Sequence, residues 1–270
     1  MTIRPPIEQR FARPSVMGVI NVTPDSFSDG GLLLHAEAAL TEAWGMLAAG
    51  AVIVDVGGES TRPGSLGVSA EDELARIEPV VEGLSGAPVS IDTSKAAVAR
   101  RALALGAELV NDVTALRGDP EMAGVVADAG CYLCLMHMQG EPRTMQDSPR
   151  YDDVVSDVKA FLEERLSVAV AAGVDERNIC LDPGIGFGKT AEHNFELVRR
   201  LDELAALGRP LLVGFSRKSS RGALTGQRVG TAAASVGAAV AAFDRGASIR
   251  RVHDVREHVE ALAAARAVAG

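Results

Sequence analysis

Short apolar runs alternate with longer amphipathic stretches along the whole chain. The runs are mostly apolar throughout, as expected for parallel strands that are covered on both faces. They predict strands over residues 16–22, 51–56, 88–92, 108–113, 131–137, 179–182, 210–215 and 248–252. Apolar residues at three- and four-residue steps predict helices between them, over 36–49, 69–84, 94–105, 121–129, 154–172, 191–206, 231–245 and 255–268.

This alternation indicates the fold class. A strict strand–helix order produces a parallel sheet with crossover helices. Eight such units in 270 residues predict an α/β protein with a (β/α)₈ TIM barrel, and an open doubly wound sheet is the alternative. No low-complexity linker divides the chain. We therefore expect an N-terminal arm over residues 1–15 and a single domain over residues 16–270.

Polar side chains stand at or just after the end of every predicted strand. They are Asn21, Asp55, Asp92, Asn111 with Asp112, His137, Asp182, Ser216 with Arg217 and Lys218, and Arg251 with His253 and Asp254. Asp and Asn are poor strand formers, so their regular occurrence at the strand ends needs an explanation. Helix capping explains single Asp or Asn residues, but it does not explain Lys218, Arg251 or His253. Because the active site of such a barrel lies at the carboxyl ends of its strands, we predict one convergent polar site there.

The charge of this predicted site differs from that of the chain as a whole. The net charge is −9, which argues against a general nucleic-acid-binding protein. The site nevertheless collects four cationic or ionisable groups, Arg62, Lys218, Arg251 and His253. Such a local excess favours a strongly anionic ligand, a phosphate or a diphosphate. For any single cation the alternative is an ion pair with Asp55 or Asp112.

A second group of site residues offers hydrogen bonds rather than positive charge. Asp92 and Asp182 accept hydrogen bonds, whereas Asn111 both donates and accepts them. Together they fit the edge of a heterocycle that carries N–H and NH₂ groups beside ring acceptors. Buried carboxylates without such a partner would be costly.

Several other patterns point to structure rather than to chemistry. Residues 184–190, GIGFGKT, look like a Walker A loop, but their glycines lack its spacing. Cys131 and Cys134 lie in a predicted strand, where buried thiols are expected rather than a redox or zinc pair. We expect a structural His137 at the end of that strand and core packing for Trp44.

Targeting signals are weak or absent in the sequence. Three cysteines in 270 residues are not a disulfide framework. No apolar run reaches the length of about 18 residues needed for a membrane span. The N-terminus has no apolar segment typical of a secretory signal. These features predict a cytoplasmic protein.

The motifs at the strand ends resemble those of the dihydropteroate synthase family of pterin-binding enzymes. They occur in chain order, as MGVINVTPDSFSDGG at 17–31, DVGGESTRPG at 55–64, SIDT at 90–93, ND at 111–112, MHMQG at 136–140, LDPGIGFGK at 181–189, SRKS at 216–219 and RVHD at 251–254. Each motif alone has little specificity, but eight in order are highly specific.

The resemblance implies a TIM-barrel transferase of folate biosynthesis and a sulfonamide target. Such an enzyme joins p-aminobenzoate to (7,8-dihydropterin-6-yl)methyl diphosphate and releases 7,8-dihydropteroate and diphosphate. Mg²⁺ is the implied cofactor, and a homodimer is the implied assembly. The two substrates are small molecules, and no nucleic acid or membrane is involved.

The resemblance also implies roles for individual residues. Asn21 would contact Mg²⁺. The pterin would be held by Asp92, Asn111, Asp182 and Lys218. The diphosphate would be bound by Arg251 and His253, with help from Thr61 and Arg62. The p-aminobenzoate pocket would be lined by Thr61, Pro63, Phe187, Lys218 and Ser219. Catalysis would depend on Lys218, Asp92, Arg251 and His253.

One departure from the family keeps other interpretations open. The family usually has an aromatic residue and then often an aliphatic one where this chain has Ser220 and Arg221. A divergent paralogue with weak or no synthase activity is therefore one alternative. A pterin-dependent methyltransferase with a corrinoid partner is another, although it would not need the cations of residues 216–218 and 251–253. A non-catalytic folate-precursor binding protein is the third.

Overall fold

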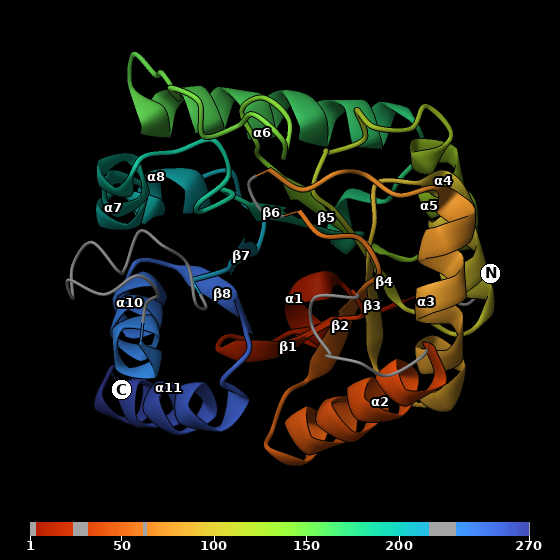
Figure 1. Cartoon of the computed structure of the whole chain (residues 1–270). Helices are drawn as coiled ribbons and strands as arrows, with labels where there is room; N and C mark the ends of the chain where they lie inside the picture. The colour runs from red at the N-terminus through yellow and green to blue at the C-terminus, as the bar shows by residue number, and fades with distance from the viewer. Residues whose placement is uncertain (1–3, 24–31, 62–63, 216–230, 270) are drawn as a thin grey trace.

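The computed structural model describes residues 4–23, 32–61, 64–215 and 231–269. Eight parallel strands form a closed barrel in chain order, and β8 pairs with β1 to close it (Figure 1). The strands are β1 (Ser15–Asn21), β2 (Ile53–Gly57), β3 (Val89–Asp92), β4 (Leu109–Asp112), β5 (Tyr132–Met136), β6 (Ile179–Asp182), β7 (Leu211–Val213) and β8 (Ala247–Val252). The predicted TIM barrel is confirmed.

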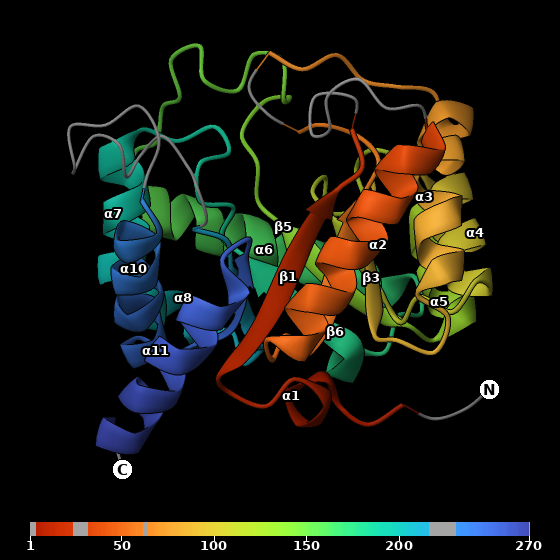
Figure 2. The same cartoon turned by 60° about the horizontal axis from the view of Figure 1, so that its bottom comes forward.

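The helices lie around the outside of the barrel (Figures 1 and 2). They are α2 (Leu32–Ala48), α3 (Ala70–Gly83), α4 (Ala96–Ala104), α5 (Met122–Ala129), α6 (Val154–Ala171), α7 (Ala191–Arg199), α8 (Leu201–Ala205), α10 (Ala232–Asp244) and α11 (Val255–Ala269), with a short 3₁₀ turn at Glu176–Asn178. Side chains cap several helix starts: Ser69, Asp153, Thr190 and Thr231 each accept a backbone N–H of the first turn.

One predicted helix is two helices in the structure. The expected helix over 191–206 breaks at Arg200, which leaves the helical conformation with φ −116° and ψ 29°. Its guanidinium binds Asp153 at 2.7 Å and Glu203 at 2.7 Å. The break turns the chain so that Leu201 and Leu204 are buried. No glycine or proline marks this position, so local sequence signals did not predict it.

The N-terminal arm closes the amino end of the barrel. Its short helix α1 (Ile7–Arg10) lies below the strands (Figure 2). Ile7 and Phe11 are buried against apolar side chains inside the barrel. The Tyr132 hydroxyl donates to the Pro5 carbonyl at 2.9 Å, and Arg10 forms an ion pair with Glu108 at 2.5 Å. The arm is therefore part of the core.

Trp44 contradicts the expectation of core packing, since it is 48% exposed. The buried stripe of α2 consists of Ala36, Ala39, Ala43 and Met46, at three- and four-residue steps. Trp44 lies one position away from this stripe, so the helix turns its indole towards solvent.

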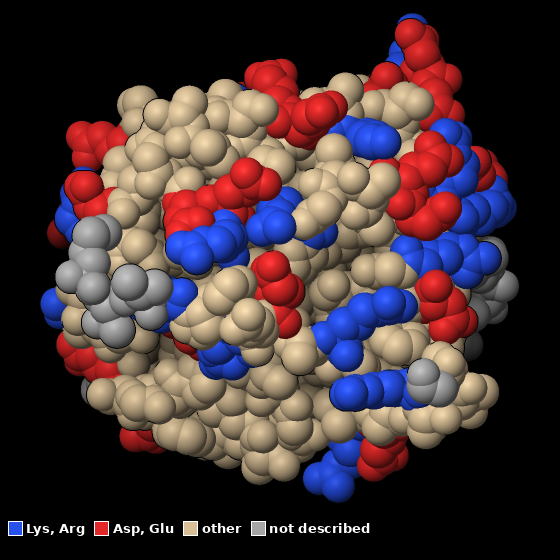
Figure 3. All heavy atoms as spheres, turned by 180° about the vertical axis from the view of Figure 1, so that it is seen from behind, with Lys and Arg blue, Asp and Glu red and all other residues tan. Residues whose placement is uncertain are grey.

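One face of the molecule shows how its charged side chains are distributed. On the face opposite to Figure 1, basic and acidic side chains are interspersed (Figure 3). No helix within the described ranges is both long enough and apolar enough to cross a membrane.

Candidate active site

Strand register brings predicted site residues to one level of the barrel. Asn21 of β1 pairs with Gly57 of β2, Gly57 with Asp92 of β3, and Asp92 with Asn111 of β4. Paired residues of neighbouring strands point to the same side of a sheet, so the three polar side chains share the inner face. Deeper in the barrel the interior is apolar, with Met17, Ile53, Leu109 and Leu212. The polar groups are thus confined to the carboxyl end.

A cation of β8 bridges two carboxylates inside the barrel. Arg251 donates from Nε to Asp55 Oδ2 at 2.6 Å and from Nη2 to Asp92 Oδ2 at 2.6 Å. Asp55 also accepts from Asn111 Nδ2 at 2.9 Å and from Ser90 Oγ at 2.5 Å. The alternative raised from the sequence, that a cation pairs with Asp55, therefore holds for Arg251.

Electrostatics divides these charged groups into a fixed cation and a titrating acid. Burial raises the pKa of Asp92 to about 7, while Arg251 lowers that pKa and the charge of Asp55 raises it. Burial alone lowers the pKa of Arg251, but the charges of Asp55 and Asp92 outweigh it and the net direction is upward. Arg251 thus stays charged, and Asp92 is the carboxyl that takes up a proton near neutral pH.

Asn111 supplies an unsatisfied acceptor beside Asp92. Its Nδ2 is committed to Asp55, whereas its Oδ1 is buried and has no hydrogen-bond partner in the described part of the chain. An unpaired buried amide oxygen is costly. A ligand that brings an N–H to this point removes the cost. This agrees with the predicted binding of a heterocycle edge.

Asp182 ends β6, and Phe187 lies on the loop between β6 and α7. Asp182 Oδ1 accepts the Gly184 N–H at 2.7 Å, and the Asp182 carbonyl accepts the His137 N–H at 2.9 Å. Gly184 has a φ of +68°, and a Cβ there would collide with the His137 carbonyl. Phe187 is half-buried against a cluster of Val113, Met136, Met138 and Met145.

The remaining predicted residues fall into two sets. Asn21 ends β1, Thr61 follows β2 and His253 follows β8, all partly exposed at the same end of the barrel. The others, Arg62, Pro63, Lys218 and Ser219, lie outside the described residues, as do Ser220 and Arg221. Asp112 has a local role instead: its carboxylate accepts N–H groups of Thr114 and Leu116 and shapes the turn after β4.

Sequence reasoning missed a group that supports the loop after β2. Lys95 forms an ion pair with Glu59 and a second one, at 2.6 Å, with the fully buried Glu73. Arg76 donates a hydrogen bond to the Gly58 carbonyl at 2.8 Å. Burial raises the pKa of Glu73, and Lys95 lowers it. The only sequence signal was Glu73 in the first turn of a predicted helix, where an acid is ordinary.

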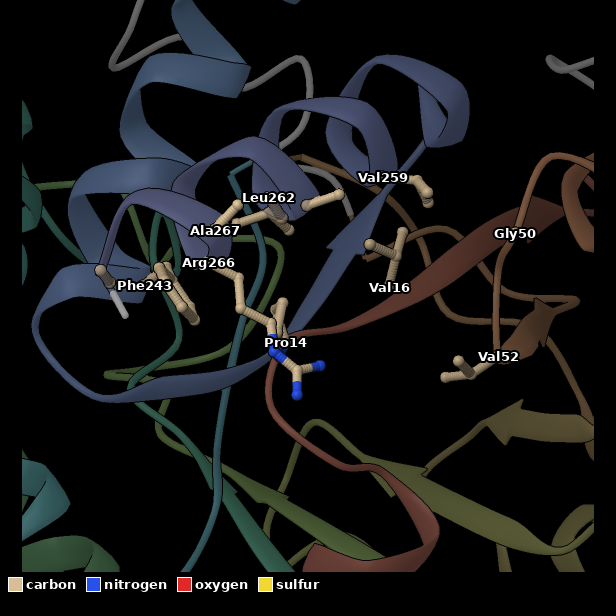
Figure 4. A pocket seen from close by; sticks show the side chains of 11 residues that line it. Pro14, Val16, Gly50, Val52, Phe243, Val259, Leu262, Arg266 and Ala267 are labelled. Atoms are coloured by element: carbon tan, nitrogen blue, oxygen red, sulfur yellow. The ribbon is translucent and has the colours of Figure 1, made fainter.

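A hollow in the surface lies away from these groups. It is an apolar groove of about 690 Å³ between the start of β1 and α11, at the amino end of the barrel (Figure 4). Pro14 and Val16 line it on one side and Val259, Leu262 and Arg266 on the other. No predicted site residue lines it, so its volume does not indicate the place of the chemistry.

A magnesium site built from several acids is not present in the described residues, which hold no suitable cluster of three or more His, Cys, Asp or Glu. Mg²⁺ bound to a diphosphate does not need such a cluster, because it keeps several waters and takes one or two protein oxygens. The partly exposed amide of Asn21 at the end of β1 fits that donor chemistry.

Known proteins agree with this geometry. The model of the pterin binding enzyme family matches residues 17–253. The dihydropteroate synthase of Neisseria meningitidis serogroup C is 49% identical over 261 residues, covering 93% of this chain and 92% of that protein. The Xanthomonas albilineans dihydropteroate synthase with 4-aminobenzoic acid has a TM-score of 0.89 at 47% identity, covering 96% and 94% of the two chains. The Yersinia pestis dihydropteroate synthase with a sulfonamide drug has a TM-score of 0.89 at 46% identity, covering 96% and 95%. The chain therefore belongs to the pterin-binding enzyme family, within its dihydropteroate synthases.

Proposed function

We propose that this chain acts through a pterin site centred on Asp92 and Asn111. The activity is that of a dihydropteroate synthase, a transferase of folate biosynthesis. It condenses (7,8-dihydropterin-6-yl)methyl diphosphate with p-aminobenzoate to 7,8-dihydropteroate and diphosphate. The observation that carries the proposal is the buried, unpaired Oδ1 of Asn111 beside a carboxylate with a pKa near neutrality.

The pterin edge supplies the N–H groups that this pair of acceptors needs. Asn111 Oδ1 and the Asp92 carboxylate each accept one, and Asp182 accepts another from its place at the end of β6. A donor to Asp92 favours its ionised form. The carboxylate then stabilises the positive charge that develops on the pterin as the leaving group departs. Arg251 holds Asp92 in place, and its contact with the diphosphate stays a prediction.

Bond cleavage and amine attack complete the reaction. The C–O bond between the pterin methylene and the diphosphate breaks, and the electron pair leaves with the diphosphate. The p-aminobenzoate nitrogen then bonds to the methylene carbon and loses a proton. We assign the diphosphate to Arg251 and His253, with help from Thr61 and Arg62. Lys218 joins the residues that hold the pterin, and Asn21 would hold Mg²⁺. Bound Mg²⁺ supplies charge stabilisation for the leaving group.

The p-aminobenzoate pocket lies, in this proposal, beside the loop after β6. Phe187 presents an aromatic ring whose other face packs on the Val113 and methionine cluster. Thr61, Pro63, Lys218 and Ser219 form the rest. We expect sulfonamide drugs to compete with p-aminobenzoate there.

The test is diphosphate release measured with and without p-aminobenzoate, for wild type, Asp182→Ala and Lys218→Ala. We expect saturable, Mg²⁺-dependent release that requires p-aminobenzoate in the wild type, and loss of turnover in both variants. Release without dependence on p-aminobenzoate, or none at all, would identify a divergent paralogue. Near-normal kinetics in either variant would overturn the residue assignment.

We further propose that the enzyme is a cytoplasmic homodimer. The late helices α10 and α11 are rich in alanine, and Val268 at the end of α11 is 89% exposed, which supports an association surface there. Cys134 and Cys180 are neighbours in the barrel register and carry free thiols, which supports a reducing compartment. Sedimentation equilibrium of the purified chain measures the assembly.

A further inference from the structure

Lysine is rare in this chain, and its positions are informative. There are four lysines against 23 arginines. A lysine whose contacts a guanidinium could not reproduce therefore differs from one that arginine could replace. Lys189 is a lysine of the first kind. It belongs to the glycine-rich stretch that fails as a Walker A loop, and the proposed function gives Lys189 itself no role.

The side chain of Lys189 is buried in what we call the lysine cage. It is only 3% exposed. Its Nζ lies 2.8 Å from His137 Nδ1 and donates to the carbonyls of Phe187 at 3.0 Å, Gly184 at 3.1 Å and His137 at 3.4 Å. The ammonium thus sits among acceptors from two loops. These contacts satisfy a charge that burial would otherwise make costly.

The cage ties together the loops that follow β5 and β6. Gly184 and Phe187 belong to the second loop and His137 to the first. A Cβ on Gly188 would collide with the Gln139 carbonyl, so the two backbones are in direct contact. The Tyr151 hydroxyl adds a bond from the first loop to the Gly188 carbonyl at 2.7 Å. Lys189 therefore fixes this backbone at Gly184, two residues after Asp182, and at Phe187 itself.

We propose that Lys189 is a positioning residue that holds Asp182 and Phe187 in their substrate-binding geometry, and that arginine cannot replace it. This rests on the roles of Asp182 and Phe187 in the proposed function. A tetrahedral ammonium directs its three donors to acceptors that converge on one point. A planar guanidinium is larger and spreads its donors along a fork, so it does not fit this closed cage.

The protonation state of His137 agrees with its place as an acceptor in the lysine cage. The ammonium carries only donors, so Nδ1 of His137 must accept and the ring proton resides on Nε2. Burial lowers the pKa of His137 to about 2, and the charges of Lys189 and Arg117 act in the same direction. The ring therefore stays neutral at the pH of the reaction.

The experiment compares Lys189→Met and Lys189→Arg with the matched controls Lys159→Met and Lys159→Arg. Lys159 is a half-buried residue of α6 with no part in the cage. The readouts are KM for both substrates, kcat, the dissociation constant of the pterin diphosphate and the thermal midpoint. We expect both Lys189 variants to raise KM and the dissociation constant about 10- to 100-fold, since misplaced groups cost that much, and the controls to match wild type.

A purely structural role gives a different result. It lowers the thermal midpoint and the active fraction, but the folded fraction then binds both substrates with wild-type constants. That result, or full activity of Lys189→Arg, would overturn the inference. If neither Lys189 variant folds, Tyr151→Phe loosens the same loop mildly, and we expect a KM increase of a few-fold; an unchanged KM would count against the proposal. Wild-type turnover tests the proposed function separately, and the pterin dissociation constants compare variants even without turnover.

Discussion

Asp92 is the site residue whose protonation changes near neutral pH. Its pKa of about 7 means that it is mostly protonated at pH 6 and mostly ionised at pH 8. The ionised form is the one that accepts a pterin N–H. We therefore expect a pterin that lacks the diphosphate to bind about tenfold more weakly at pH 6 than at pH 8, in proportion to the ionised fraction. Calorimetric titration between these pH values measures it.

Asp92→Asn is the matched variant, because it keeps the shape of the side chain and removes the titration. We expect weaker pterin binding that no longer changes between pH 6 and pH 8. A pH dependence of pterin binding that persists in Asp92→Asn would show that another group titrates.

The raised pKa of Asp92 also has a consequence for the stability of the fold. Between the unfolded and folded pKa values, the native state holds a proton that the unfolded chain has lost. The free energy of unfolding therefore falls as pH rises towards 7.

At the scale of residues, the sequence predicted that Asp92, Asn111 and Arg251 lie at one end of the barrel but not how they pair. Asp92 and Asn111 were placed correctly at one barrel end because strand ends converge there. The partners of Arg251 depend on side-chain rotamers and on the distance across the barrel, which one-dimensional spacing does not contain. The prediction that Trp44 packs in the core was wrong because the buried stripe of α2 consists mostly of alanines, whose hydrophobic signal in the sequence is weak.

Among the elements, α1 is the one whose contribution is hardest to see in the sequence. It spans four residues, too short for a periodic pattern, and its burial depends entirely on the open end of a barrel. We predict that Phe11→Ala costs about 3–5 kcal/mol of unfolding free energy, as for other fully buried aromatic side chains. Urea denaturation measures this cost.

The exposed Trp44→Ala serves as the control and should change the unfolding free energy by less than about 1 kcal/mol. Helix α1 and Phe11 lie at the opposite end of the barrel from the site, so folded Phe11→Ala should retain wild-type KM values. A large KM increase in that variant would mean that the amino end of the barrel communicates with the site.

The strands and helices themselves were predictable because their signals are local. Seven of the eight helical stretches and all eight strands fall within a few residues of their predicted bounds. The exception, the break at Arg200, depends on ion pairs with Asp153 and Glu203, and the first of these partners lies 47 residues away in sequence. Long-range pairs of this kind leave no periodic trace.

For the molecule as a whole, the net charge of −9 works against capture of a diphosphate from solution. Binding therefore has to depend on charges close to the site and, in the proposed function, on a metal ion that would arrive with the substrate. Asn21 offers Mg²⁺ a neutral amide oxygen at the carboxyl end of β1. A neutral ligand holds the metal only together with the diphosphate, so free enzyme should bind Mg²⁺ weakly.

We accordingly predict that Asn21→Ala raises the Mg²⁺ concentration for half-maximal diphosphate release about tenfold or more, in line with other ligand-sphere changes. The rate at saturating Mg²⁺ should stay much closer to wild type, because the remaining ligands are waters and substrate oxygens. A Mg²⁺ titration of turnover at fixed substrate separates the two effects. An unchanged half-saturation with a lowered maximal rate would instead assign Asn21 to the substrate and leave the metal to the diphosphate alone.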